Sequence, residues 1–228
     1  MRKSTKKLGI ECSRLCKCTK NHINCLTAKD LIKAQIVIQA FYYEGRDIRD
    51  KNVHSATFLI SLSKNFIKPL THEGELVLDP FVGKGTTLLA SRGQNRNAVG
   101  FDLKKEYVDL ATKRLSQESL GITQQIAIPG DARNISEYLE KESVKFSITS
   151  PTYANMLNHP CKNKSVGGDL RENKHYLKAQ QYSDDPKDLR GMNRKLYSDA
   201  LTEIYTGIYD LIKPKSYVVI WKTGVKYA

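Results

Sequence analysis

The chain has 228 residues, 40% of them hydrophobic, which is enough for one sizeable α/β core with little left for a second domain. Its 37 lysine and arginine residues exceed its 24 acidic residues, and the formal net charge of +13 favours polyanions such as nucleic acid over a generically basic surface. No run approaches the roughly 20 apolar residues that cross a bilayer, and no secretory signal is recognisable, so we expect a cytoplasmic protein.

Residues 1–30 are predicted to form a basic, irregular arm. Four of the five cysteines fall in this arm, namely Cys12, Cys16, Cys18 and Cys25. His22 lies between the last two. A reducing compartment argues against disulfides, and the spacing lacks the two CxxC pairs of a typical zinc site. We therefore expect free thiols and no metal, with zinc as the weaker alternative.

Two helices are predicted before the first core strand. Apolar residues recur at helical spacing over residues 31–43 and again over residues 55–70, where Pro69 closes the second helix. A polar link, residues 44–52, separates the two. The second helix leads directly into the sheet.

Strands and helices then alternate along the chain. We predict strands at Leu76–Leu78, Ala98–Phe101, Gln125–Ile128 and Phe146–Thr149 and helices at Thr86–Arg92, Lys104–Gln117 and Ile135–Glu140. Such alternation requires right-handed crossovers and a parallel sheet that is covered by helices on both faces. The predicted fold class is α/β, doubly wound and Rossmann-like.

The last third of the chain begins with a long polar segment. Residues 154–194 contain few apolar side chains and exceed an ordinary connection, which predicts an active-site or DNA-facing insert. A helix at Leu196–Leu211, a turn at residues 213–215 and a strand at Tyr217–Trp221 follow. We expect residues 31–228 to form one domain that carries this insert.

A glycine-rich block, DPFVGKGTT at residues 79–87, follows the first predicted strand. Ligands of doubly wound sheets bind at this end of a strand, and two glycines permit a tight turn close to a ligand. The block is not a phosphate-binding P-loop, because glycine follows Lys84, and a dinucleotide site is disfavoured because Leu88 replaces the third small residue. The expected ligand-binding residues of this block are Asp79, Phe81, Gly83, Gly85, Thr86 and Thr87.

Two further aspartates follow the next strands. Asp102 ends the second strand, close to the spacing at which an acidic residue reaches a ribose diol, and Asp131 follows the third. A carboxylate at Asp131 can accept a hydrogen bond from an adenine amine. Each aspartate could instead cap a helix.

A second block, Ser150-Pro151-Thr152-Tyr153, ends the fourth strand. The Ser150 hydroxyl and the Pro151 carbonyl can each accept an N–H bond from an exocyclic base amine, which localises the lone pair of that amine. Tyr153 can stack on a base that has left the duplex. These three residues are the predicted catalytic residues; a plain turn after the strand is the structural alternative.

Together the two blocks resemble those of amino-group DNA methyltransferases, the N4-cytosine and N6-adenine class with DPFxGxGTT and SPPY motifs. The resemblance covers residues 53–222, with residues 54–70 similar to the family's methionine-side helix. It implies a methyltransferase fold, S-adenosylmethionine as cofactor, Asp102 on its ribose and Asp131 on its adenine. The serine form of the second motif implies methylation of cytosine N4 in DNA, as in restriction–modification systems.

The sequence departs from this family in two places. Thr152 replaces the second proline, which restores a backbone N–H and loosens the segment. The family's terminal helix and antiparallel hairpin have no counterpart after Trp221, which suggests a fragment, half of a split enzyme or a degenerate copy, and in the split case a missing C-terminal or recognition subunit. An adenine-N6 or RNA methyltransferase and a noncatalytic DNA-binding subunit are therefore alternatives, and a nicotinamide dehydrogenase is a weaker one.

Overall fold

The computed structural model describes residues 7–10, 13–18, 23–34, 45, 59–118, 121–152 and 185–221. Four predicted features lie wholly or mainly outside these residues. They are most of the first helix and the polar link (35–52), Tyr153, and the polar insert up to residue 184.

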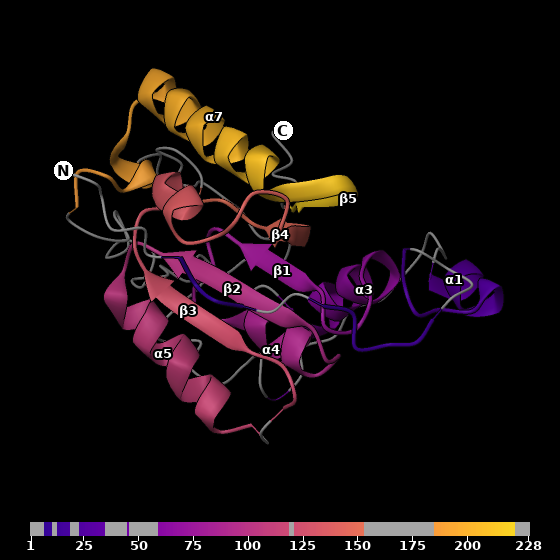
Figure 1. The fold of residues 1–228 in the computed structure, drawn as a ribbon. Helices are drawn as coiled ribbons and strands as arrows, with labels where there is room; N and C mark the ends of the chain where they lie inside the picture. Colours follow the sequence, from indigo (N-terminus) through magenta and orange to yellow (C-terminus); the bar gives the residue numbers. More distant parts are fainter. Residues whose placement is uncertain are drawn as a thin grey trace, which may run out of the picture.

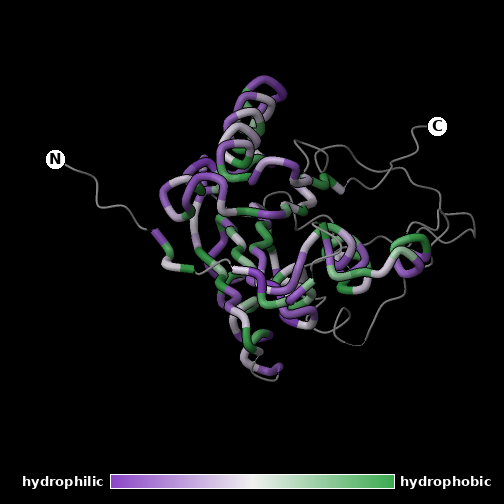
Figure 2. The backbone as a smooth tube through the Cα atoms, turned by 45° about the vertical axis from the view of Figure 1, so that its right-hand side comes forward, coloured by the Kyte–Doolittle hydropathy of each residue, from purple (hydrophilic) through white to green (hydrophobic). Residues whose placement is uncertain are grey.

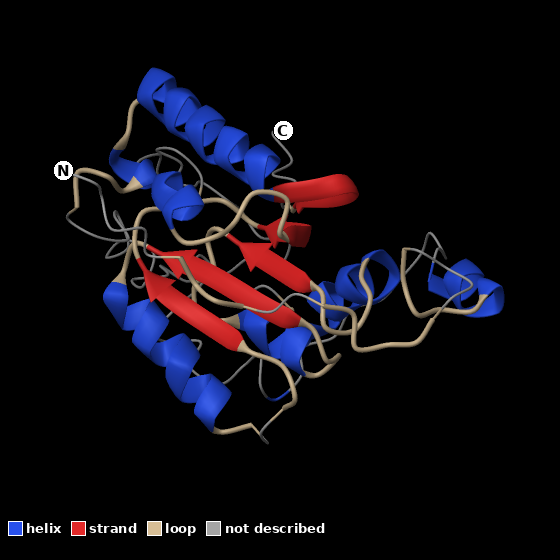
Figure 3. Ribbon diagram, in the orientation of Figure 1, coloured by secondary structure: helices blue, strands red, loops and turns tan. Residues whose placement is uncertain are grey.

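The centre of the molecule is a sheet of five parallel strands in the order β3-β2-β1-β4-β5 (Figures 1 and 3). The strands are β1 Leu76–Asp79, β2 Asn97–Asp102, β3 Gln125–Pro129, β4 Val144–Thr149 and β5 Ile212–Ile220. The order reverses direction between β1 and β4, which is the topological switch of a doubly wound sheet. The predicted Rossmann-like α/β fold class is confirmed.

Helices cover both faces of the sheet. Successive side chains of a parallel strand point to opposite faces, and both faces carry apolar residues that must be buried. Leu76 and Leu78 of β1 pack in one core cluster with η1 (Ala132–Glu137) and α7 (Arg194–Leu211). Val77 points to the other cluster. The helices on that side are α3 (Ile60–Leu70), α4 (Thr86–Arg92) and α5 (Lys105–Ser116).

The longest helix, α7, packs against the sheet through one apolar face. Its buried residues recur four positions apart at Ala200, Ile204 and Ile208 and end at Leu211. In Figure 2 hydrophobic and hydrophilic stretches alternate along this helix. Asn193 caps its first turn by accepting a hydrogen bond from the Leu196 amide at 3.0 Å.

Three predicted elements differ from the structure. The first helix begins at Ala28, three residues before its predicted start and within the arm expected to be irregular. The segment expected as an α-helix from Ile135 is the short 3₁₀ helix η1, which begins three residues earlier because Asp131 caps it. The last strand begins at Ile212 and includes residues 213–215, which were predicted to form a turn. Val144 pairs with Ile212 and Phe146 with Tyr217, so the residues between them form an irregularity in the strand.

The described parts of the N-terminal arm are attached to the domain. The Leu8 amide donates to the Tyr138 carbonyl at 2.8 Å, and the Leu15 amide donates to the Glu73 carbonyl at 2.8 Å. The short helix α1, Ala28–Ala34, contacts α3. The arm therefore runs beside the loop that leads into β1 (Figure 1).

Candidate active site

The predicted motifs meet at the carboxyl edge of the sheet. Asp79 ends β1, Asp102 ends β2, and Ser150 directly follows β4. Strands β2 and β4 both pair with β1 in parallel, so the three strand ends lie at one edge. Figure 3 shows the arrowheads of β1, β2 and β3 pointing to the same side.

Asp79 ties three elements of this edge together. One carboxylate oxygen accepts a hydrogen bond from the Thr87 hydroxyl of α4 at 2.5 Å. The other accepts from the Phe81 amide and from the Thr149 hydroxyl of β4, each at 3.0 Å. The glycine loop, the first turn of α4 and the strand that carries Ser150 are thereby held by one side chain.

Burial changes the acidity of this carboxyl group. Asp79 is only 5% exposed, and burial raises its pKa to about 6, against three hydrogen bonds that lower it. The largest hydrogen-bond contribution comes from Thr87, followed by Phe81 and Thr149. The three hydrogen bonds hold Asp79 against the glycine loop, and its contact with a cofactor stays a prediction.

The two glycines of the loop adopt backbone angles that favour glycine. Gly83 has φ of 49° and Gly85 has φ of 81°. A Cβ atom on Gly85 would lie 2.7 Å from the Cβ of Ala111 in α5, closer than real side chains approach. Gly85 is also the N-cap of α4, so the turn and the close helix contact both depend on this position.

Asp102 faces the loop from the neighbouring strand. Its carboxylate accepts hydrogen bonds from the Gly83 amide at 3.0 Å and the Lys104 amide at 2.9 Å. Burial raises its pKa to about 6, and the negative charges of Asp79 and Asp188 add to that shift. The residue is half-buried, so its carboxylate combines a fixed orientation with access to a ligand.

Asp131 lies beyond β3, where its side chain caps η1. Its carboxylate forms an ion pair with Arg133, with 2.5 Å between Oδ2 and Nη2, and accepts the Arg133 amide at 3.0 Å. Burial alone would raise the pKa of Asp131, but the hydrogen bonds and charge of Arg133 outweigh it and lower the pKa. The capping alternative is confirmed here, and the adenine contact stays a prediction.

The segment after β4 is anchored through backbone carbonyls. The Tyr197 hydroxyl of α7 donates to the Thr152 carbonyl at 2.8 Å, and the Trp221 amide donates to the Thr149 carbonyl at 2.8 Å. Pro151 is buried, whereas Ser150 is half-buried at the edge. The structure thus places Ser150 at the carboxyl edge of the sheet, directly after the residue that hydrogen-bonds to Asp79.

Thr149 and Tyr197 were not predicted from the sequence. Thr149 is a polar residue that directly precedes Ser150, and this position next to the second motif is the signal that could have identified it. Tyr197 gave no such signal, because its partner is a carbonyl 45 residues away.

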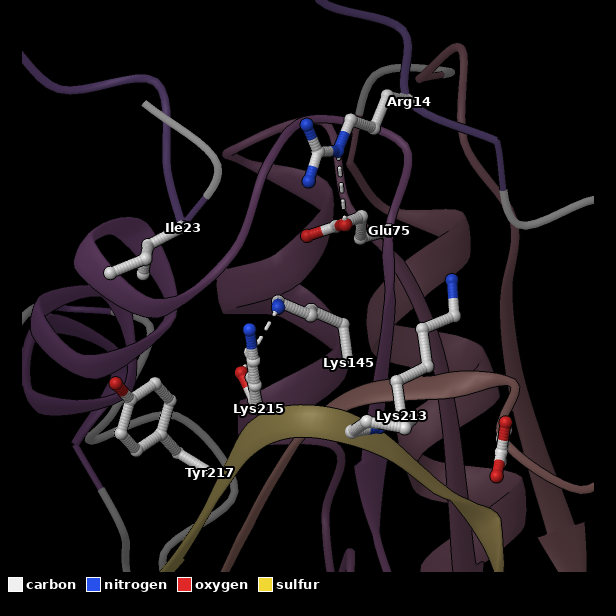
Figure 4. Close-up of a pocket in the computed structure, with 9 residues that line it drawn as sticks. Arg14, Ile23, Glu75, Lys145, Lys213, Lys215 and Tyr217 are labelled. Carbon is white, nitrogen blue, oxygen red and sulfur yellow. Dashed lines mark hydrogen bonds and ion pairs between the residues drawn. The ribbon is translucent and has the colours of Figure 1, made fainter. Parts of the chain in front are cut away.

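A cavity of about 730 Å³ lies at the opposite edge of the sheet (Figure 4). It is lined by Glu75 before β1, Lys145 of β4 and the first part of β5. The Arg14 Nε and a Glu75 oxygen are 3.4 Å apart at its rim, and Lys145 donates to the Lys215 carbonyl at 3.4 Å. This cavity is separate from the predicted motifs and contains none of their residues.

The glycine loop lies in a segment that matches a known protein family. Residues 22–113 match a family model described as DNA methylase, N6_N4_Mtase. The predicted resemblance to amino-group DNA methyltransferases is confirmed. The matched segment includes the glycine loop and Asp102 and ends before Asp131 and Ser150. The roles of the individual residues stay predictions.

Curated methyltransferases are similar over short segments. The Type II methyltransferase M.ScaI of Streptomyces caespitosus is 36% identical over 70 residues, which are 31% of this chain and 23% of that protein. M.HindIII of Haemophilus influenzae is 41% identical over 69 residues, 30% of this chain and 22% of that protein. The matches to these DNA methyltransferases thus span less than a quarter of each relative's length.

Two further similarities extend over more of the chain. The Type II methyltransferase M.MthZI of Methanothermobacter thermautotrophicus is 29% identical over 106 residues, 42% of this chain and 28% of that protein. A solved rRNA methylase from Streptococcus thermophilus has 17% identity and a TM-score of 0.44, and the match covers 70% of this chain and 67% of that one. Within the described part of the chain, no helix has the length and apolar character of a membrane span.

Proposed function

We propose that this chain transfers a methyl group from S-adenosylmethionine to the N4 amine of cytosine in DNA. The observation that supports it most is the 3.0 Å hydrogen bond from Thr149 to Asp79, which joins the strand carrying Ser150 to the glycine loop. The family match over residues 22–113 supports the methyltransferase class.

The residues of the glycine loop fit an adenosyl cofactor. The Asp102 carboxylate is oriented by the Gly83 amide and is half-buried, so its remaining lone pairs can accept ribose hydroxyls. Phe81 is partly exposed beside the loop and offers an apolar surface to the cofactor. Asp79, Thr86 and Thr87 are buried and act by shaping the loop. Asp131 would reach the adenine amine through an oxygen that it shares with Arg133.

The second motif supplies the acceptors for the base. The Ser150 hydroxyl and the Pro151 carbonyl accept the two N–H bonds of the target amine, which draws its lone pair out of conjugation. S-adenosylmethionine, when bound, would supply the electrophilic methyl group, with its sulfur as the leaving group. The nitrogen that these two acceptors orient would take the methyl group and lose one proton to solvent. Alignment of this kind can supply effective molarities of roughly 10⁵ M.

DNA is the proposed substrate for two reasons. The net charge of +13 attracts polyanions, and the similar curated proteins are Type II methyltransferases. The base must leave the helix to reach Ser150, and Tyr153 is proposed to stack on it. The polar insert, residues 154–194, is proposed to face the DNA.

The test is to incubate the protein with S-adenosylmethionine and mixed-sequence DNA, digest the DNA and identify the modified nucleoside. N4-methylcytosine is the expected product. If the product is N6-methyladenine, the chain is a DNA methyltransferase but the proposed target base is wrong. If a parallel reaction with tRNA gives methylation and the DNA reaction gives none, the proposed substrate is wrong.

One observation favours a second candidate, a noncatalytic DNA-binding subunit. Thr152 occupies the position of the family's second proline, so the segment that aims the Pro151 carbonyl is less restricted. Calorimetric titration with S-adenosylmethionine separates the two functions: binding of the cofactor without any methyl transfer supports the subunit.

A further inference from the structure

The geometry points to a structural zinc site formed by Cys16, Cys18, Cys25 and His72. The three sulfur atoms and a histidine ring nitrogen all lie within 4.8 Å of one another. All three cysteines are free thiols, and His72 is fully buried. Three cysteines and one histidine are a common ligand set of structural zinc.

The distances suit one tetrahedral ion. The Cys16 sulfur lies 3.1 Å and the Cys25 sulfur 3.5 Å from Nδ1 of His72. Zinc–sulfur bonds of about 2.3 Å and zinc–nitrogen bonds of about 2.1 Å place tetrahedral ligands roughly 3.5–3.8 Å apart. Shifts of less than about 1 Å would bring the four atoms into that geometry.

The backbone around the cluster is held independently of a metal. Leu15 donates its amide to the Glu73 carbonyl at 2.8 Å, and the Asn24 side chain donates to the Pro69 carbonyl at 2.5 Å. Gly74 has φ of 82°, and a Cβ there would lie 2.2 Å from a backbone oxygen of the arm. The arm and the loop before β1 are therefore in close contact on both sides of His72.

A buried positive charge near the cluster complements a bound ion, and a carboxylate positions one ligand. Zinc with three thiolates and a neutral imidazole carries one net negative charge. Arg96 is 3% exposed and donates to both oxygens of Thr71, the residue before His72. Glu75 accepts the His72 amide at 2.8 Å, which fixes the backbone of the ligand.

The position of the cluster indicates a structural ion. His72 precedes β1, whereas Asp79 ends it, and the four residue steps from Glu75 to Asp79 span roughly 13 Å. Four protein ligands also leave no open coordination position for a substrate. The ion would fasten the N-terminal arm to the amino edge of the sheet. Among the described residues, His72 completes the set.

Metal analysis of the full chain, purified without chelator, tests this inference. We expect about one zinc ion per chain by mass spectrometry, and a cobalt-loaded sample with the visible absorption of tetrahedral thiolate ligation. Zinc removal by a chelator should lower the melting temperature, and re-addition should restore it. A chain that takes up no zinc or cobalt, or that carries iron and sulfide instead, overturns the assignment.

Matched variants identify the ligands. Cys16→Ser and His72→Asn should each lose most of the zinc, whereas Cys161→Ser and His22→Asn should retain it. Loss of zinc in His22→Asn with retention in His72→Asn would overturn the proposed ligand set. If His72→Asn does not fold, Cys18→Ser provides the same comparison at a half-buried position.

Discussion

The hydroxyl of Thr149 donates to the carboxylate of Asp79 at 3.0 Å, across 70 residues of sequence. Thr149 ends β4 and Asp79 ends β1, the two strands that flank the switch point of the sheet. The bond therefore places Ser150 beside the loop proposed to bind the cofactor. Replacing Thr149 tests the coupling between the two motifs.

Thr149→Val keeps the shape of the side chain and removes the donor. The buried carboxylate of Asp79 then loses one of its three partners, which should cost about 1–3 kcal/mol in the free energy of unfolding. We also expect slower methyl transfer than in Thr149→Ser, which keeps the hydroxyl. Urea unfolding and initial rates measure both effects. Equal rates for the two variants would show that the bond does not align the motifs.

The raised pKa of Asp79 predicts a pH-dependent stability. The pKa of Asp79 is about 6 in the folded state and 3.8 for an ordinary aspartate, so the folded state binds the proton more tightly than the unfolded state does. The resulting stabilisation is complete below about pH 4 and is lost as the pH rises through about 6. Asp79→Asn should reduce the difference in unfolding free energy between about pH 4 and pH 8 by on the order of 3 kcal/mol. An unchanged pH profile in the variant would contradict the shift.

Gly85→Ala should destabilise the loop. The new methyl group meets Ala111 at 2.7 Å, and φ of 81° strains any residue with a side chain. We expect a loss of about 1–3 kcal/mol and weaker binding of S-adenosylmethionine. Gly93→Ala is the matched control, since Gly93 has φ of −63° and its nearest neighbouring atom is at 3.6 Å. Similar losses of unfolding free energy in both variants would show that the backbone angle and close contact of Gly85 do not cause its effect.

Tyr197→Phe removes the hydroxyl that binds the Thr152 carbonyl at 2.8 Å and leaves the ring in place. The segment carrying Pro151 should become less fixed, and we expect the turnover number to fall several-fold while the melting temperature changes little. Tyr209→Phe serves as the control because that side chain is 81% exposed on the same helix. An unaltered turnover number in Tyr197→Phe would show that the Tyr197 hydroxyl does not position the segment that carries Pro151.

Thr152→Pro restores the family's second proline. The carbonyl that Tyr197 binds is retained, and proline fixes φ, so methyl transfer should be maintained or increased. Single-turnover rates on DNA provide the measurement. A large fall in rate with unchanged folding would show that threonine has a role of its own.

The order of the elements could be predicted because strand and helix periodicities are local. Helix α4 was predicted with its observed bounds, and the strand ends fell within two residues of the observed ones through β4. The register shift in β5 could not be predicted, because it depends on which residues of β5 pair with β4. The contact of Cys16 with His72 joins residues 56 positions apart, and no local spacing encodes it.

The most direct test of the account is a crystal structure of this chain with S-adenosylmethionine. We predict that the ribose lies on Asp102 and that the sulfonium methyl points toward Ser150, beside the Gly83–Gly85 turn. Cofactor bound at the opposite edge, in the cavity between Arg14 and Lys213, would contradict the central claim.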